Sequence, residues 1–150
     1  MEQITQDSLT TSSWRNFYDL MKNNVTSVTV TGIGAVTIQN YVAAYTDKML
    51  DSKTSYPILI VNSPEFSFNP LTFRSKETEA RVEIEILCNQ AVTADQFKDR
   101  IQKIIRDNEA TLRALGMDEV ELEDTASEFF TRGNINVHSR KLVWRFRFAF

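Results

Sequence analysis

The stretch TEARVEIEILCNQAVTADQFKDRIQKIIRDNEATLRALG, residues 78–116, decides the fold because its hydrophobic period changes part-way along. Residues 78–90 place apolar side chains at every second position, with charged side chains at most positions between them. A period of two is that of a strand with one face buried. The face predicted to be buried contains Ala80, Val82, Ile84, Ile86 and Cys88.

The second part of this stretch has the 3.6-residue period of a helix. Thr93 and Gln96 match the capping box T-x-x-Q, which predicts a helix start at Thr93, and Gly116 supplies a C-terminal stop. The apolar residues at helical spacing are Phe97, Ile101, Ile104, Ile105, Leu112 and Leu115. A half-buried strand followed by an amphipathic helix is therefore expected here.

The N-terminal side of this unit contains a second predicted helix and further strands. Residues 8–23 carry Trp14, Phe17, Tyr18 and Met21 on one helical face. Residues 25–41 are rich in Val and Thr and predict a hairpin that turns near Gly32–Gly34, and residues 58–61 predict a short buried strand. The pattern of residues 42–55 fits either a short helix or a loop.

Residues 64–77 have no helical period and are predicted to form an extended interaction loop. Its phenylalanines are hard to bury locally, so we interpret them as a contact surface for another subunit. The alternative is a loop that folds back on the core. The candidate interface consists of Phe66, Phe68, Phe73, Arg74 and, from a second predicted turn, Arg132.

The C-terminal side completes the sheet. Residues 118–124, DEVELED, predict a strand, residues 132–134 a turn, and residues 141–150, KLVWRFRFAF, a final strand with alternate large apolar residues. Helix, strands, helix, strands without βαβ repetition predicts a single α+β domain over residues 1–150. We expect an antiparallel or mixed sheet with two main helices packed on one face, the last strand being either central or at an edge.

Two groups of charges are candidate sites. Glu83 and Glu85 share one strand face, where they suit an acid/base pair, a cation site or a ladder of ion pairs. Arg145 and Arg147 have the same spacing on the last strand, so we favour a cross-strand ladder of these four residues. The second group is an acidic strand face formed by Glu119, Glu121 and Glu123.

Composition and motifs exclude several classes of function. The 150-residue chain has a net charge of −3, which argues against a general nucleic-acid binder, and no apolar run approaches a membrane span. The first residues do not resemble a signal peptide, and the single cysteine favours a reducing compartment. His138 and Cys88 are not in a recognisable catalytic motif, and Gly32-Ile33-Gly34 lacks the third glycine of a dinucleotide loop. We predict no catalytic, metal-binding or cofactor-binding residues and a protein that is not an enzyme.

The order of these elements resembles the small tail-terminator (tail-completion, head–tail joining) proteins of long-tailed bacteriophages. The resemblance is carried by the leading helix, YPILIVNSP (56–64), ARVEIEILCN (80–89), TADQFKDRIQKIIRDNEATLRALGM (93–117) and the closing HSRKLVWRFRFAF (138–150). It rests on hydrophobic spacing and element order rather than on an invariant motif. Residues 24–50 are longer than the family pattern.

The resemblance implies a structural virion protein without cofactors. Family members form a ring, commonly a hexamer, that caps the tail tube, stops its polymerisation and contacts the head connector or stopper protein. DNA passes through the ring without specific binding, and Glu119, Glu121 and Glu123 are a candidate lining of its lumen. The expected location is the tail or neck of the virion, after assembly in the host cytoplasm. The alternatives are another head–tail connector, a tail-tube component, or a cellular α+β enzyme or ligand-binding domain.

Overall fold

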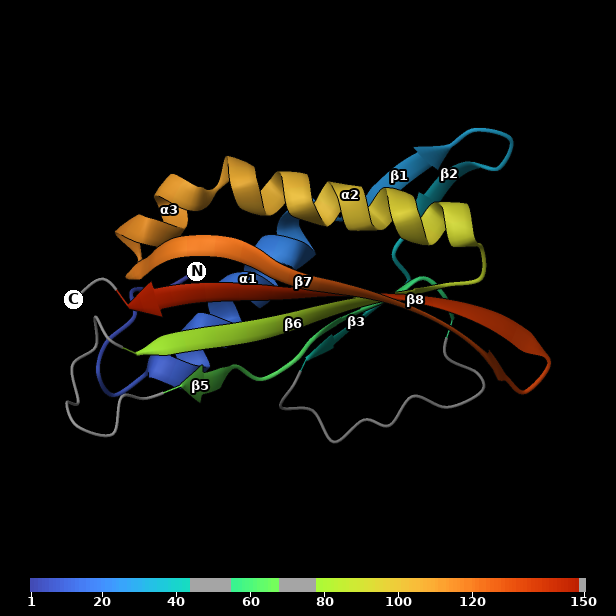
Figure 1. The fold of residues 1–150 in the computed structure, drawn as a ribbon. Helices are drawn as coiled ribbons and strands as arrows, with labels where there is room; N and C mark the ends of the chain where they lie inside the picture. The colour runs from blue at the N-terminus through green and yellow to red at the C-terminus, as the bar shows by residue number, and fades with distance from the viewer. Residues whose placement is uncertain (44–54, 68–77, 149–150) are drawn as a thin grey trace.

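The computed structural model describes residues 1–43, 55–67 and 78–148, drawn in colour in Figure 1. These ranges contain both helices and a mixed sheet, so the predicted α+β class is confirmed. The elements in chain order are α1 (Leu9–Asn24), β1 (Ser27–Val30), β2 (Gly34–Thr37), β3 (Asn40–Ala43), β4 (Ile58–Val61), β5 (Glu65–Ser67), β6 (Glu79–Cys88), α2 (Ala91–Asp107), α3 (Glu109–Ala114), β7 (Met117–Arg132) and β8 (Ile135–Phe148).

The main sheet has the strand order β3-β4-β6-β8-β7, and β5 also pairs with β6. β3 runs parallel to β4, and the other pairs are antiparallel. β8, the strand predicted from its alternating aromatics, lies between β6 and β7 and is therefore central. The path through the sheet ends in β3 on one side and in β7 on the other.

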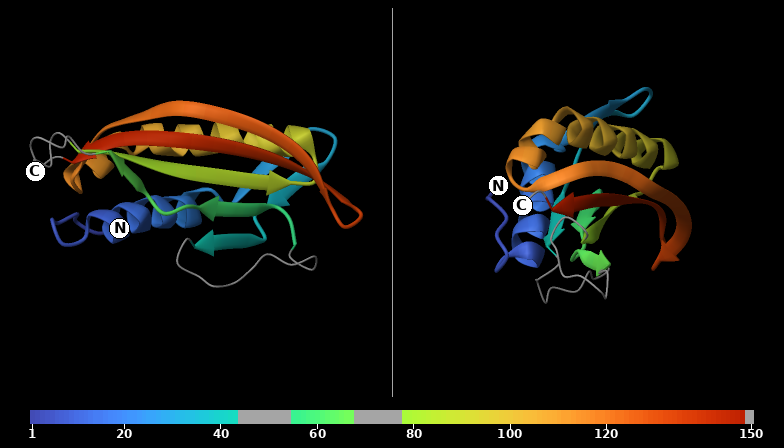
Figure 2. Two further views of the ribbon diagram at one scale, coloured as in Figure 1. Left: turned by 60° about the horizontal axis from the view of Figure 1, so that its bottom comes forward. Right: turned by 60° about the vertical axis from the view of Figure 1, so that its left-hand side comes forward.

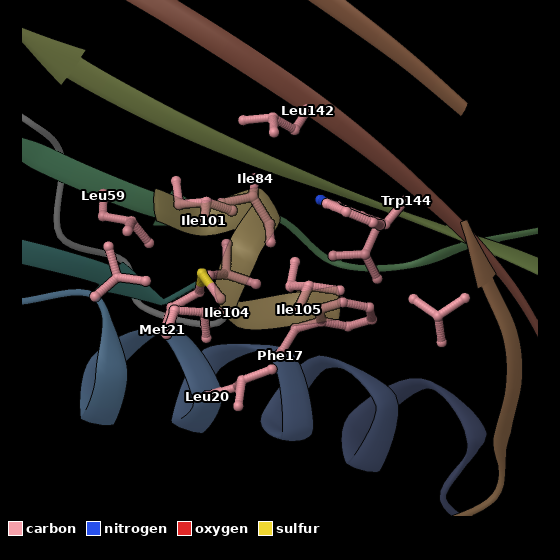
Figure 3. Packing of buried hydrophobic residues seen from close by; sticks show 14 of the residues in the cluster. Phe17, Leu20, Met21, Leu59, Ile84, Ile101, Ile104, Ile105, Leu142 and Trp144 are labelled. Atoms are coloured by element: carbon pink, nitrogen blue, oxygen red, sulfur yellow. The ribbon is translucent and has the colours of Figure 1, made fainter. Parts of the chain in front are cut away.

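Both long helices lie on the same face of this sheet (Figure 2), as the sequence predicted. They form one core with one face of β4, β6 and β8, because β6 and β8 alternate apolar and polar residues and β4 is apolar throughout. Figure 3 shows Phe17 and Met21 of α1 facing Ile101 and Ile105 of α2, with Trp144 of β8 beside them. The opposite face of the sheet, which we call the open face, carries most of its charged side chains.

The second helix differs from its prediction at both ends. α2 begins at Ala91, and its N-cap residue Gln90 makes no side-chain capping hydrogen bond. The capping box at Thr93 is therefore wrong: Thr93 lies inside the first turn and is buried, so burial against the sheet displaced the cap. The helical stretch is also divided at Asn108, where α2 ends and α3 begins, and Gly116, with a φ of 102°, follows α3.

The N-terminal hairpin is confirmed, but the next segments were not fully predicted. β1 and β2 pair around Gly32 and Gly34, whose φ angles of 85° and 96° favour glycine. β3 was missed as a separate strand. The predicted loop 64–77 begins instead with β5, which pairs with β6, and residues 68–77 lie outside the described part of the chain.

β7 and β8 form a hairpin that is much longer than predicted. The pairing of β8 with β6 stops at His138, opposite Cys88, whereas β7 and β8 continue together to Arg132 and Ile135. Residues 130–137 therefore extend beyond the last pair of β6 with β8. Together with the pair Phe129–His138 at their base they form a two-stranded segment, residues 129–138, which we call the ribbon and which Figures 1 and 2 show at one end of the molecule.

Candidate functional site

The open face of the sheet carries a ladder of ion pairs, but not the one predicted. In the observed register Glu83 lies opposite Val143 and Glu85 opposite Lys141, whereas Arg145 lies opposite Arg81 and Arg147 opposite Glu79. The prediction that Glu83 and Glu85 face Arg145 and Arg147 is therefore wrong. The two strands are antiparallel neighbours, as the prediction assumed. The burial of their apolar residues sets a register in which the two glutamates of β6 do not lie opposite the two arginines of β8.

The observed ladder joins three neighbouring strands, β6, β8 and β7. Its contacts are Arg147–Glu79 at 3.0 Å, Arg147–Glu119 at 3.5 Å, Arg145–Glu121 at 2.8 Å, Arg81–Glu123 at 2.6 Å, Lys141–Glu128 at 3.2 Å and Lys141–Glu85 at 3.7 Å. Arg147 and Lys141 of the central strand β8 therefore each bridge one acid on β6 and one on β7. Exposed pairs of this kind stabilise a fold by about 0.2–1 kcal/mol each, so the ladder adds only modest stability.

The acidic face predicted from DEVELED lies on β7 and takes part in this ladder. Each of Glu119, Glu121 and Glu123 contacts an arginine, so these residues do not form a bare acidic stripe. Hydrogen bonding from Arg81 lowers the pKa of Glu123 below its usual value, which keeps this carboxyl ionised. Among the described residues, carboxylates on this face nevertheless outnumber cations: Glu65, Glu79, Glu83, Glu85, Glu119, Glu121, Glu123 and Glu128 accompany Arg81, Lys141, Arg145 and Arg147.

Two bulges interrupt the pairing of β7 with β8 near these acids. The register between β7 and β8 shifts between Asp118 and Glu121 and again between Leu122 and Asp124. Glu119 has a φ of 51°, an unusual conformation for a residue with a side chain. Bulges of this kind twist an edge strand and hinder pairing with another chain.

Glu85 is the most buried carboxyl of the ladder, with 17% of its side chain exposed. Burial raises its pKa, although the hydrogen bond donated by Ser139 Oγ at 2.8 Å and the nearby Lys141 both act to lower it. The folded state therefore holds a proton on Glu85 more tightly than the unfolded state does.

Replacing Glu85 by glutamine should change how stability depends on pH. Because the folded pKa is raised, wild-type Glu85 contributes stability at low pH that is lost as the pH rises through the folded pKa. The stability of Glu85→Gln relative to wild type should therefore increase from pH 4 to pH 7, as measured by urea denaturation at several pH values. Glu128→Gln, at an exposed pair, provides the control. A constant difference for Glu85→Gln across this range would contradict the expectation.

Of the predicted subunit interface, the structure describes Phe66 and the backbone of Arg132. Phe66 lies in β5, half-buried against the core, with its ring centroid 5.8 Å from that of Phe148. Phe66 is therefore a core contact, in agreement with the alternative prediction that this segment folds back on the core. Phe68, Phe73 and Arg74 lie outside the described residues, and Arg132 is the last residue of β7, where the ribbon turns.

The ribbon instead carries exposed apolar residues that the sequence analysis missed. Phe129 is 59% exposed, and Phe130 and Ile135 are each 37% exposed. Phe129 contacts His138 on the helix side of the ribbon, with a ring-centroid distance of 5.0 Å. The signal in the sequence was the pair of adjacent phenylalanines beside a predicted turn, but only the length of the hairpin shows that neither reaches the main core.

The β1–β2 hairpin lies at the same end of the molecule (Figure 1) and forms a second uncharged surface. Residues 25–46 contain no charged side chain, and the β1–β2 hairpin within them exposes Ile33 to 49%. A hollow of about 260 Å³ adjoins this hairpin, and we call it the end hollow. It is lined by Ile33 and Val36 of the hairpin, Tyr56 and Pro57 before β4, and Gln90 and Thr93 at the start of α2.

Residues suited to catalysis do not form a reactive group in the described part of the chain. Cys88 and His138 are opposite each other on β6 and β8, yet burial raises the pKa of the Cys88 thiol to about 12. A reactive cysteine requires the opposite shift. No group of three or more His, Cys, Asp or Glu residues that could hold a metal occurs among the described residues. None of the described helices has the length and apolar character needed to cross a membrane.

Comparison with known proteins does not assign this chain to a family. No protein-family model matches the chain, and no curated protein matches its sequence. Its function must therefore be inferred from the fold, the open face and the ribbon.

Proposed function

We propose that this chain is a structural, non-enzymatic virion subunit that forms a ring, caps a bacteriophage tail tube and joins it to the head connector. The observation that carries the proposal is the ribbon, which exposes aromatic side chains to water on a hairpin that projects beyond the end of β6. Exposed aromatic residues on a projecting element are typical of surfaces that other proteins cover. They have no catalytic use in the described surroundings.

The order of the elements supports the same assignment. A leading helix, α1, precedes the short buried strand β4, the alternating strand β6, the helix α2 and the closing pair β7–β8. This is the order on which the resemblance to tail terminators rests.

The open face suits a channel through which DNA passes without binding. Its cations are already paired with carboxylates, and its carboxylates are in excess. Phosphate groups would therefore gain little by contacting Arg81, Arg145 or Arg147, since each would have to leave an acid. In the proposed ring, this face, with Glu119, Glu121 and Glu123, lines the lumen.

Native mass spectrometry with negative-stain imaging over a range of protein concentrations tests this function. We expect rings of a fixed small number of subunits, most simply six, with a central hole. Addition of the rings to growing tail tubes of the same phage should stop elongation at defined ends. Strict monomers that also fail to bind tube ends would contradict the proposal, whereas open-ended tubes made of this chain alone would indicate a tail-tube subunit.

A further inference from the structure

We propose that the ribbon of one copy of this chain docks on the end hollow of a second copy, with Phe129 seated in the hollow. This proposal rests on the proposed ring function, and it names the two surfaces by which neighbouring subunits of the ring would touch. Phe129 is the most exposed of the large apolar residues described, and it lies on the helix side of the ribbon beside His138.

Three large apolar side chains of the ribbon, Phe129, Phe130 and Ile135, stay exposed in a single copy of the chain. Val137 packs on Ile58 and Leu87 at the base of the ribbon, but residues 130–136 extend past the end of β6, where two strands alone form the hairpin. An isolated two-stranded hairpin is only marginally stable in water. Covering Phe129, Phe130 and Ile135 by another subunit would remove apolar surface from water and fix the hairpin in one conformation.

The end hollow has the size and lining for an aromatic side chain. Its volume of about 260 Å³ suits side chains rather than a small-molecule ligand, and none of its lining residues is charged. Two other hollows differ in this respect. One is lined by Asp99, Arg100 and Lys103, and the other by Glu65, Arg81 and Glu83, so seating a phenyl ring in either would desolvate charges.

The charge distribution favours a second copy as the occupant. The ribbon has one charged residue, Arg132, in positions 129–138, and the hairpin beside the hollow has none, whereas charged residues make up 25% of the whole chain. The core of a protein interface is likewise depleted in charged residues. The ribbon and the hairpin beside the hollow are therefore alike in having few charges. A contact between them would bury neither a carboxylate nor an unpaired ammonium group.

Contact between two different surfaces has a geometric consequence. The ribbon and the end hollow belong to separate elements, so their association is heterologous and each bound copy leaves one ribbon and one hollow free. Repetition of such a contact closes a ring when the rotation between neighbours divides a full turn. The proposed contact thus requires no surface other than the two described.

Chemical cross-linking between two cysteine variants tests the contact. Thr131→Cys places a thiol on the ribbon near Phe129, and Ala35→Cys places one near Ile33; both positions are exposed. The two purified variants are mixed and treated with a short bis-maleimide, to which the buried Cys88 should not react because its pKa is about 12. We expect the mixed dimer to exceed, by about tenfold, the product formed with Asp107→Cys, which lies at the far end of α2.

Two further results distinguish the contact from simple collision. Adding Phe129→Ser to Thr131→Cys should abolish the excess without changing the melting temperature greatly, because Phe129 is exposed. Three results would each overturn the proposal. The first is as much cross-linked dimer with Asp107→Cys as with Ala35→Cys, and the second is a product in which Thr131→Cys is linked mainly to itself. The third is a yield of mixed dimer that Phe129→Ser does not change. Linked chains that never form rings would contradict the ring function alone, whereas rings that lack this cross-link would contradict the contact alone.

Discussion

Replacing Phe146 by alanine is expected to lower the free energy of unfolding by about 3–5 kcal/mol. Phe146 is fully buried in the central strand β8, and its ring lies 5.8 Å from that of Phe17 on α1 and 5.5 Å from that of Phe148. Its partner on β6 is Ala80, which is also buried. Because the large side chain fills the space left by the small one, truncation would leave a cavity that neighbouring strands cannot close.

Val143→Ala is the matched control for this substitution. Val143 lies on the same strand but on the open face, where it is only half-buried, so its truncation should cost about 1 kcal/mol. Urea denaturation followed by tryptophan fluorescence and circular dichroism gives both values. If both substitutions lowered the free energy of unfolding equally, the two faces of the sheet would not differ in burial as the structure shows.

The second large effect concerns Trp14, whose replacement by alanine should also cost about 3–5 kcal/mol. Its indole Nε1 donates a hydrogen bond to the carbonyl oxygen of Val61 at 3.0 Å, and its ring stacks on Tyr18 with centroids 4.9 Å apart. The residue therefore ties α1 to β4 by both packing and polarity. Trp14→Phe should keep most of the packing and lose about 1–3 kcal/mol, because the buried donor is removed.

Trp144 provides an internal comparison, because its indole nitrogen is buried without a hydrogen-bond partner among the described residues. Trp144→Phe deletes an unsatisfied donor, so the relief of its desolvation cost should offset part of the lost packing. We expect Trp144→Phe to be less destabilising than Trp14→Phe by about 1 kcal/mol or more. If Trp144→Phe lowers the free energy of unfolding more than Trp14→Phe does, the packing of the Trp144 indole outweighs the cost of its unpaired N–H.

Local patterns predicted the elements of this fold well where one period continued without interruption. The alternation in residues 78–90 marks β6, and the helical spacing around Phe97 and Ile101 marks α2. The ends of α2 were less predictable, because Thr93 satisfies a capping pattern in the sequence but is buried against the sheet in the structure. Tertiary burial, which a local motif does not contain, decided its position.

The candidate site depended more strongly on long-range geometry. Alternation placed Glu83, Glu85, Arg145 and Arg147 on one face, but it could not fix the register between strands about 60 residues apart. The positive φ of Glu119 and the two register shifts in β7 are likewise invisible in a run of alternating acids. The ribbon escaped prediction because exposure of Phe129 depends on where β6 ends, not on the residues around Phe129.

The central position of β8 has a consequence for the order in which the protein is made. β6 and β8 are neighbours in the sheet, yet Cys88 leaves the ribosome about 50 residues before its partner His138, a delay of roughly 2–10 s during synthesis. Throughout that interval one edge of β6 has no strand of its own chain to pair with. The nascent chain therefore passes through a stage at which the free edge of β6 is open to capture by a chaperone or by another nascent chain.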